Sequence, residues 1–128
     1  MEVNHNVVGW FEIPVSDMER AIQFYETVFG FKVERHQLGP LDMGWFPGVQ
    51  GSIGAGGSLV CMPEMYKPSA EGTLIYFTAF SGDVALELGR VETAGGKVLI
   101  EKKLIAEDIG YMGLFLDSEG NRIAVHSR

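Results

Sequence analysis

Glu12 and His126 are the two side chains in this sequence best suited to acid–base chemistry. Glu12 lies in the middle of an alternating apolar segment, where a carboxylate is costly unless it is paired or solvated. If the fold brings the two together, they could bind a substrate, serve as general acid and base, or hold a relocated metal ion. The structural alternative is an ordinary hydrogen bond for Glu12 and solvent exposure for His126.

Aromatic and sulfur-containing side chains supply a second signal. Ligand pockets are typically lined by apolar and aromatic groups with a few polar anchors. Trp10 shares strand parity with Glu12, while Trp45 lies beside a Gly-rich stretch and Met62 is a further candidate. Burial in an ordinary core is the alternative for the aromatic residues. The predicted ligand-binding residues are Trp10, Glu12, Trp45, Tyr76, Met112 and His126.

The remaining reactive residue types favour no other chemistry. His5 and His36 lie in polar surroundings, so we expect both to be exposed. Cys61 has no partner for a disulfide, and its apolar neighbours indicate a buried thiol. The glycine-rich segment 51–57 lacks the Lys-Ser/Thr that completes a phosphate-binding loop.

The elements that must position these residues are readable from hydrophobic periodicity. Residues 10–15 alternate with the period of a strand, with Phe11, Ile13 and Val15 facing the core. Residues 18–29 follow as a helix that Ser16 or Asp17 caps and Gly30 ends. The other expected strands cover 31–37, 45–46, 58–62, 74–81, 97–104, 110–117 and 122–127, and a second helix covers 84–94.

The same plan occurs twice. Asp17 and Asp83 both cap a helix that a glycine ends and a strand follows, and they lie about 66 residues apart, half the chain. We therefore expect one α+β domain over 1–128, with two βαβββ modules at about 7–63 and 73–128. The modules are expected to form a curled mixed sheet, a half-open barrel with the helices outside. A doubly wound fold would need more helices than the sequence offers.

Composition excludes several classes of partner. The formal net charge is −7, and the ten Lys and Arg residues are scattered. Nucleic acids and anionic membranes both attract basic surfaces, so we expect neither as a partner. The N-terminus has no signal-peptide pattern and no apolar run is long enough to span a membrane, so the expected location is the cytoplasm.

Two segments resemble a known superfamily. The run from Phe11 to Phe31, FEIPVSDMERAIQFYETVFGF, is similar to the opening module of the vicinal oxygen chelate proteins. These include lactoylglutathione lyase (glyoxalase I), bleomycin-resistance proteins and extradiol dioxygenases. The run from Leu116 to Ala124, LDSEGNRIA, resembles their closing hairpin, with Ser118 where proline is commoner. The resemblance implies paired βαβββ modules and commonly a homodimer.

The resemblance also implies where a metal would bind. Enzymes of this superfamily usually hold a divalent metal with His, Gln or Glu from four strands. The matching positions here are Trp10, a residue near Val60, Tyr76 and Ala124. None is a usual ligand for such a cation. No metal site and no cofactor are therefore predicted, and a divalent metal held by other residues is the alternative.

The predicted function is binding of a small organic molecule by a protein of the glyoxalase/bleomycin-resistance type that lacks the usual metal site. One alternative is a lyase or isomerase of the lactoylglutathione lyase type, in which Glu12 and His126 hold a relocated metal or act as a metal-free acid–base pair. A second alternative is an accessory interaction module.

Overall fold

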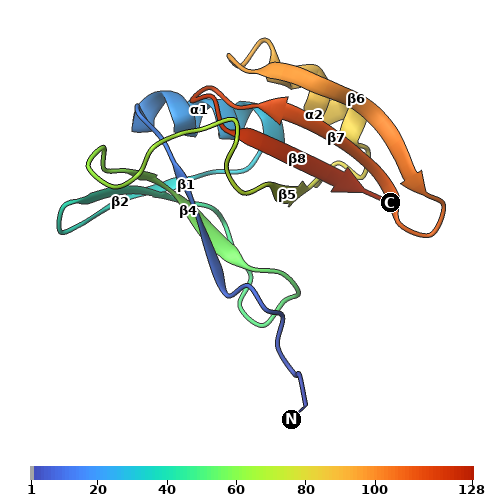
Figure 1. Ribbon diagram of the computed structural model, residues 1–128, viewed down its shortest axis with the longest axis horizontal. Helices are drawn as coiled ribbons and strands as arrows, with labels where there is room; N and C mark the ends of the chain where they lie inside the picture. The colour runs from blue at the N-terminus through green and yellow to red at the C-terminus, as the bar shows by residue number, and fades with distance from the viewer. Residues whose placement is uncertain (1) are drawn as a thin grey trace.

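The computed structural model describes residues 2–128, and it confirms the predicted α+β fold of two βαβββ modules (Figure 1). The first module contains β1 (Trp10–Pro14), α1 (Met18–Phe29), β2 (Glu34–Leu38), β3 (Leu41–Trp45) and β4 (Gly56–Cys61). The second contains β5 (Ile75–Thr78), α2 (Val84–Val91), β6 (Lys97–Ala106), β7 (Gly110–Leu116) and β8 (Arg122–Ser127). Neither helix is long and apolar enough to cross a membrane.

Each module forms its own four-stranded mixed sheet. The strand orders are β1-β4-β3-β2 and β5-β8-β7-β6, so the two modules have the same topology. The strands β1 and β4 are parallel, as are β5 and β8, and the other neighbours are antiparallel. Within residues 2–128 the two sheets are not hydrogen-bonded to each other and do not close into a barrel. The edge strands β1 and β5 therefore remain open.

Helix α1 begins and ends as the sequence predicted. The Asp17 side chain accepts a hydrogen bond from the backbone N–H of Arg20, and Gly30 ends the helix in the left-handed region with φ of 81°. Helix α2 begins after Asp83 but ends at Val91, before the predicted residue 94. The chain turns early because the Gly96 N–H donates to the Val91 carbonyl, which directs it into β6.

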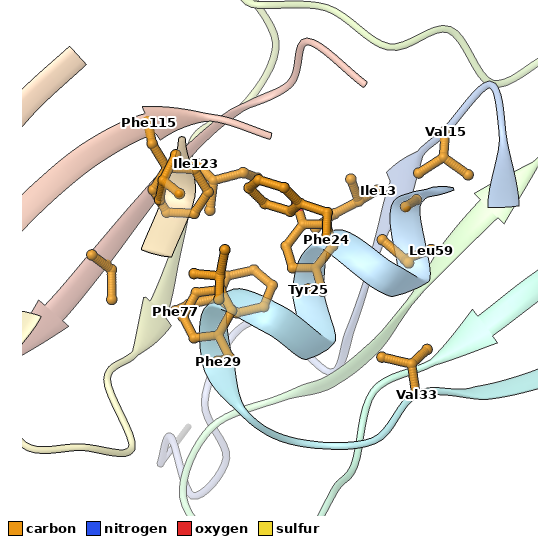
Figure 2. Close-up of a cluster of buried hydrophobic side chains, with 14 of the residues drawn as sticks. Ile13, Val15, Phe24, Tyr25, Phe29, Val33, Leu59, Phe77, Phe115 and Ile123 are labelled. Atoms are coloured by element: carbon orange, nitrogen blue, oxygen red, sulfur yellow. The ribbon is translucent and has the colours of Figure 1, made fainter. Parts of the chain in front are cut away.

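One hydrophobic core joins the two modules (Figure 2). Phe24, Tyr25 and Phe29 of α1 are buried, and the Phe29 ring stacks on Phe77 of β5 with ring centroids 4.9 Å apart. The Phe24 ring lies tilted against Phe115 of β7, with ring centroids 5.9 Å apart. Because both helices pack on one side of the sheets and against each other, the opposite sheet faces lie outside this core.

The hairpin between β7 and β8 also ties the modules together. The Tyr25 hydroxyl donates to Asp117 Oδ2 at 2.6 Å, and Asn121 Nδ2 donates to the Pro14 carbonyl at 2.7 Å. Burial raises the pKa of Asp117, although the bonds from Tyr25 and Asn121 oppose that rise. Asn121 Oδ1 accepts from the Ser69 N–H, which anchors the segment that links the modules. The predicted turn thus serves as a joint between them.

Candidate functional site

The first open surface is the side of sheet β1-β4-β3-β2 that faces away from the helices. Strand register places Glu12 beside Ser58, Ser58 beside Trp45, and Trp45 beside Glu34. Neighbouring residues of β1 point the other way, as the burial of Ile13 in the core shows. We call this surface the first-sheet face, defined by Trp10, Glu12, Glu34, His36, Trp45 and Ser58.

Aromatic rings cluster on the first-sheet face. The Trp10 and Trp45 rings meet edge to face with centroids 5.9 Å apart, and the His36 ring lies 4.5 Å from Trp45. Trp10 covers Gly56 so closely that an added Cβ there would lie 3.3 Å from the indole. This packing partly covers His36, whose side chain remains 40% exposed, so the prediction that it is exposed holds in part.

Glu12 is anchored by two neutral donors. The Tyr66 hydroxyl donates to Glu12 Oε1 at 2.7 Å, and Trp10 Nε1 lies 3.4 Å from Oε2. The hydrogen bond to Glu12 raises the pKa of Tyr66, so this phenol keeps its proton and acts as the donor. The arrangement leaves a carboxylate oriented between two aromatic side chains, in a position to contact a bound molecule.

The second open surface is the corresponding side of the other sheet. Register places His126 of β8 between Thr78 of β5 and Met112 of β7, and it places Ala124 beside Tyr76. The imidazole Nε2 of His126 lies 2.7 Å from the Ile109 carbonyl oxygen, and Tyr76 is 52% exposed. We call this surface the second-sheet face, defined by Tyr76, Thr78, Met112, Ala124 and His126.

The six predicted ligand-binding residues therefore fall into two groups. Trp10, Glu12 and Trp45 lie on the first-sheet face, and the other three lie on the second-sheet face. Glu12 and His126 belong to different sheets, and no hydrogen bond or ion pair joins them in the part of the chain that the structure describes. A single chain does not assemble the predicted acid–base pair.

The four positions where the sequence resemblance implies metal ligands do not carry side chains that fit a divalent cation. Register pairs Trp10 with Gly56 and Tyr76 with Ala124. Internal symmetry therefore assigns the position expected near Val60 to Gly56. None of these four residues offers a carboxylate or an imidazole. Among residues 2–128, no three His, Cys, Asp or Glu side chains are grouped so that they could hold a metal ion.

One apolar cavity lies where the two modules meet. It has a volume of about 500 Å³ and is lined by Phe side chains, the 47–57 segment and two residues of the second-sheet face, Tyr76 and Thr78. A smaller cavity of about 220 Å³ lies beside Glu12 and is also lined by Lys67 and Arg122. Tyr76 and Glu12 are the predicted site residues that border these cavities.

Sequence reasoning gave no site role to Glu34, His36, Ser58 or Tyr66. Ser58 lies two residues before Val60 and shares its strand parity, so the alternation could have placed it on this face. Tyr66 lies in the segment between the modules, which contains no regular pattern, and only the structure brings it to Glu12.

Comparisons with known proteins agree with this fold. A family model of the Glyoxalase/Bleomycin resistance protein/Dioxygenase superfamily matches residues 7–125. A hypothetical protein from S. aureus has a TM-score of 0.70 at 20% identity, covering 98% of this chain and 96% of its own. A glyoxalase/bleomycin resistance protein from Albidiferax ferrireducens has a TM-score of 0.67 at 16% identity, with coverages of 96% and 99%.

Glyoxalase I from Zea mays has a TM-score of 0.67 at 17% identity, and the match covers 92% of this chain but 44% of that one. At these identities the structural likenesses establish a shared fold and leave the ligand open. No protein of curated function matches the chain in sequence.

Proposed function

Because this chain belongs to the Glyoxalase/Bleomycin resistance protein/Dioxygenase superfamily, we propose that it binds a small organic molecule on the sheet faces that its helices leave open. The observation that carries the proposal is the cluster of Trp10, Trp45 and Glu12 on the first-sheet face. Aromatic walls around one oriented polar group are what small-molecule sites use for affinity and for orientation. Binding of this kind requires no metal.

A homodimer is the proposed working unit. Strands β1 and β5 are open sheet edges, and Trp10 and Tyr76 are 45% and 52% exposed. A second copy that laid its second-sheet face over the first-sheet face would bring Glu12 opposite His126 of the partner subunit. Two-fold symmetry would then create two identical composite sites.

The enzymatic alternative depends on the same assembly. A lyase or isomerase using Glu12 and His126 as acid and base needs the two side chains within hydrogen-bond reach of one substrate. The described chain holds them apart, each with its own partner. We therefore propose binding as the function, with catalysis or a relocated metal as the alternative. The cytoplasmic location and the absence of nucleic-acid partners stay predictions.

A thermal-shift screen over aromatic compounds, thiol conjugates and antibiotics tests the proposal. A ligand present at about 100 times its Kd should stabilise the folded protein by about 2.7 kcal/mol. We expect the Glu12→Ala and His126→Ala variants to lose this stabilisation. Glu64→Ala and His5→Ala, which change exposed residues that belong to neither face, are the matched controls. Hits that neither Glu12→Ala nor His126→Ala alters would contradict the site.

Elemental analysis of untagged protein separates the metal-dependent alternative from the proposal. The proposal expects less than stoichiometric nickel, zinc, iron or manganese after purification. One tightly held ion per chain would instead favour a metal site built from other residues.

A further inference from the structure

The first-sheet face carries a line of residues whose chemistry selects for charge. Across the four strands, register places Glu12, Ser58, Trp45 and Glu34 side by side. Two carboxylates thus flank a serine and an indole. Trp10 packs against that indole, so aromatic faces lie close to both acids.

Neither carboxylate is neutralised by a Lys or Arg side chain in residues 2–128. Glu12 accepts only from Trp10 and Tyr66, which are neutral donors. Lys67 and Arg122 line the small cavity beside Glu12, but their hydrogen bonds go to backbone oxygens: Lys67 Nζ donates to the Pro63 carbonyl and Arg122 Nη2 donates to the Gly72 carbonyl.

Glu34 is in a similar position at the other end of the line. The Glu34 side chain is 79% exposed, and its Oε1 lies 3.6 Å from His36 Nε2. The His36 imidazole carries a charge only when it is protonated. Negative charge beside partly exposed indoles attracts an organic cation through both Coulomb and cation–π interactions.

Three buried polar atoms on the same face lack hydrogen-bond partners in the described structure: Ser58 Oγ, Trp45 Nε1 and His36 Nε2. Ser58 is fully buried, and its Oγ makes no hydrogen bond in the described structure. Trp45 Nε1 is also buried and unpartnered. Buried polar groups are normally paired, and such exceptions call for a ligand or a solvent molecule. A serine oxygen can accept from an ammonium N–H, and an indole N–H can donate to a carbonyl or hydroxyl oxygen.

We infer that the first-sheet face recognises an organic cation: a protonated ammonium group, with N–H donors, on a ligand that also carries a hydrogen-bond acceptor. Glu12 supplies the main charge, Trp10 and Trp45 supply the aromatic walls, and Ser58 and Trp45 Nε1 bind the polar groups. This inference rests on the proposed function and specifies the chemical class of its ligand.

Tryptophan fluorescence provides a direct readout, because Trp10 and Trp45 are the two tryptophans of the chain. The probes are benzylammonium, neutral benzyl alcohol and anionic benzoate, which share one ring and differ in charge. Benzylammonium also carries the N–H groups from which Ser58 Oγ can accept. We expect saturable quenching by the cation at concentrations at least tenfold below those needed for the other two. Added salt should weaken the binding, since the attraction is between charges.

Three Glu→Gln variants test which carboxylate attracts the cation. Glu12→Gln should weaken cation binding about tenfold or more, because it removes the charge and keeps the shape. Glu34→Gln should weaken it less, because that carboxylate is exposed to solvent. Glu71→Gln, an exposed acid in the segment between the modules, should leave it unchanged.

Ser58→Ala separates recognition from folding. Because the hydroxyl has no partner, its removal should weaken cation binding without lowering the urea midpoint of the free protein. A lower midpoint with unchanged binding would overturn this role.

The outcomes also distinguish failure of the cation inference from failure of the proposed function. Equal binding of the three probes would overturn the cation inference and leave small-molecule binding in place. The same conclusion would follow if Glu12→Gln bound the cation as tightly as wild type. If no probe and no compound in the thermal-shift screen binds, the proposed function itself is wrong.

Discussion

Glu119 shows how one residue can couple the two modules. Its carboxylate accepts hydrogen bonds from the backbone N–H groups of Ser16 and Asp17, from two nitrogens of Arg20 and from the Ser118 hydroxyl. Burial alone would raise its pKa, but the bonds from Arg20, Asp17, Ser118 and Ser16 outweigh burial and lower the pKa to about 2. The charged form is therefore favoured in the folded protein, at the beginning of α1.

Acid should remove this contribution. The folded pKa lies below the ordinary value of 4.5, so the stabilisation is complete above about pH 4.5 and is lost as the pH falls toward 2. We expect Glu119→Gln to lower the free energy of unfolding by about 2 kcal/mol at pH 7. The effect is smaller than the pKa shift alone implies, because Arg20 is half-exposed and solvent partly screens its charge. The difference from wild type should shrink between pH 4.5 and 2.5.

Urea unfolding at several pH values measures this difference. Asp117 has a raised pKa and gives a slope of opposite sign, but both proteins contain it, so the comparison isolates Glu119. Glu71→Gln is the control. A difference that stays constant from pH 7 to 2.5 would mean that Glu119 stabilises the fold through packing alone.

At the same scale, strand alternation was enough to predict which residues of β1 point away from the helix-packed core. Trp10 and Glu12 share a face because side chains alternate along a strand, and the same rule pairs Tyr76 with Thr78. Alternation could not reveal that Trp45 lies beside Ser58, because that depends on the register of β3 on β4 across a glycine-rich connection. Local alternation was therefore enough to place Trp10 and Glu12 on one face. Placing Trp45 beside Ser58 required knowledge of how the strands pair.

At the scale of elements, helix α2 packs closely on β7 because Gly113 has no side chain. A Cβ at Gly113 would lie 2.4 Å from Leu88 Cδ1, and Leu88 is buried in the core. The helix cannot move away easily, because Val84 and Val91 are also buried on the same side. The glycine thus sets the distance between helix and sheet.

A pair of Gly→Ala substitutions tests this packing. Gly113→Ala should destabilise the protein by about 1–3 kcal/mol, the usual cost of overpacking a core. Gly89→Ala in α2 meets no atom within 4 Å, and it should stabilise the protein by roughly 0.5–1 kcal/mol because alanine favours the helix. Urea unfolding measures both, and a Gly113→Ala variant as stable as wild type would show that the interface has free space.

Element boundaries were predictable where a local signal exists. Asp17 and Gly30 define α1 through a cap and a left-handed residue, so both ends were correct. The strand β3 begins at Leu41, earlier than predicted, because it pairs with β2 through a turn at Gly39 and Pro40 that leaves no clear alternation. The end of α2 at Val91 likewise depends on tertiary packing, since Gly96 lies against the Leu116 carbonyl and Phe24.

At the scale of the whole molecule, the internal repeat explains why one chain presents two incomplete faces. Each module buries one side of its sheet under a helix, and the helices pack together into a shared core. The faces opposite the helices consequently lie on separate sheets that the structure leaves unclosed (Figure 1). The repeat was visible in the sequence, but the separation of the sheets was not, because it is set by helix–helix packing between modules.

Subunit mixing tests whether two copies complete one site. If the protein is a homodimer of about twice the 14.1 kDa chain, Glu12→Ala and His126→Ala variants each lose binding at both composite sites. After dissociation and reassociation of a 1:1 mixture, half of the dimers carry one intact site, so about a quarter of all sites should regain binding. Mixing Glu12→Ala with the Glu12→Ala/His126→Ala double variant is the control and should restore none. Mixing cannot repair a site that is built within one chain. If binding does not recover in a mixture that is proven to exchange subunits, each chain binds its ligand alone.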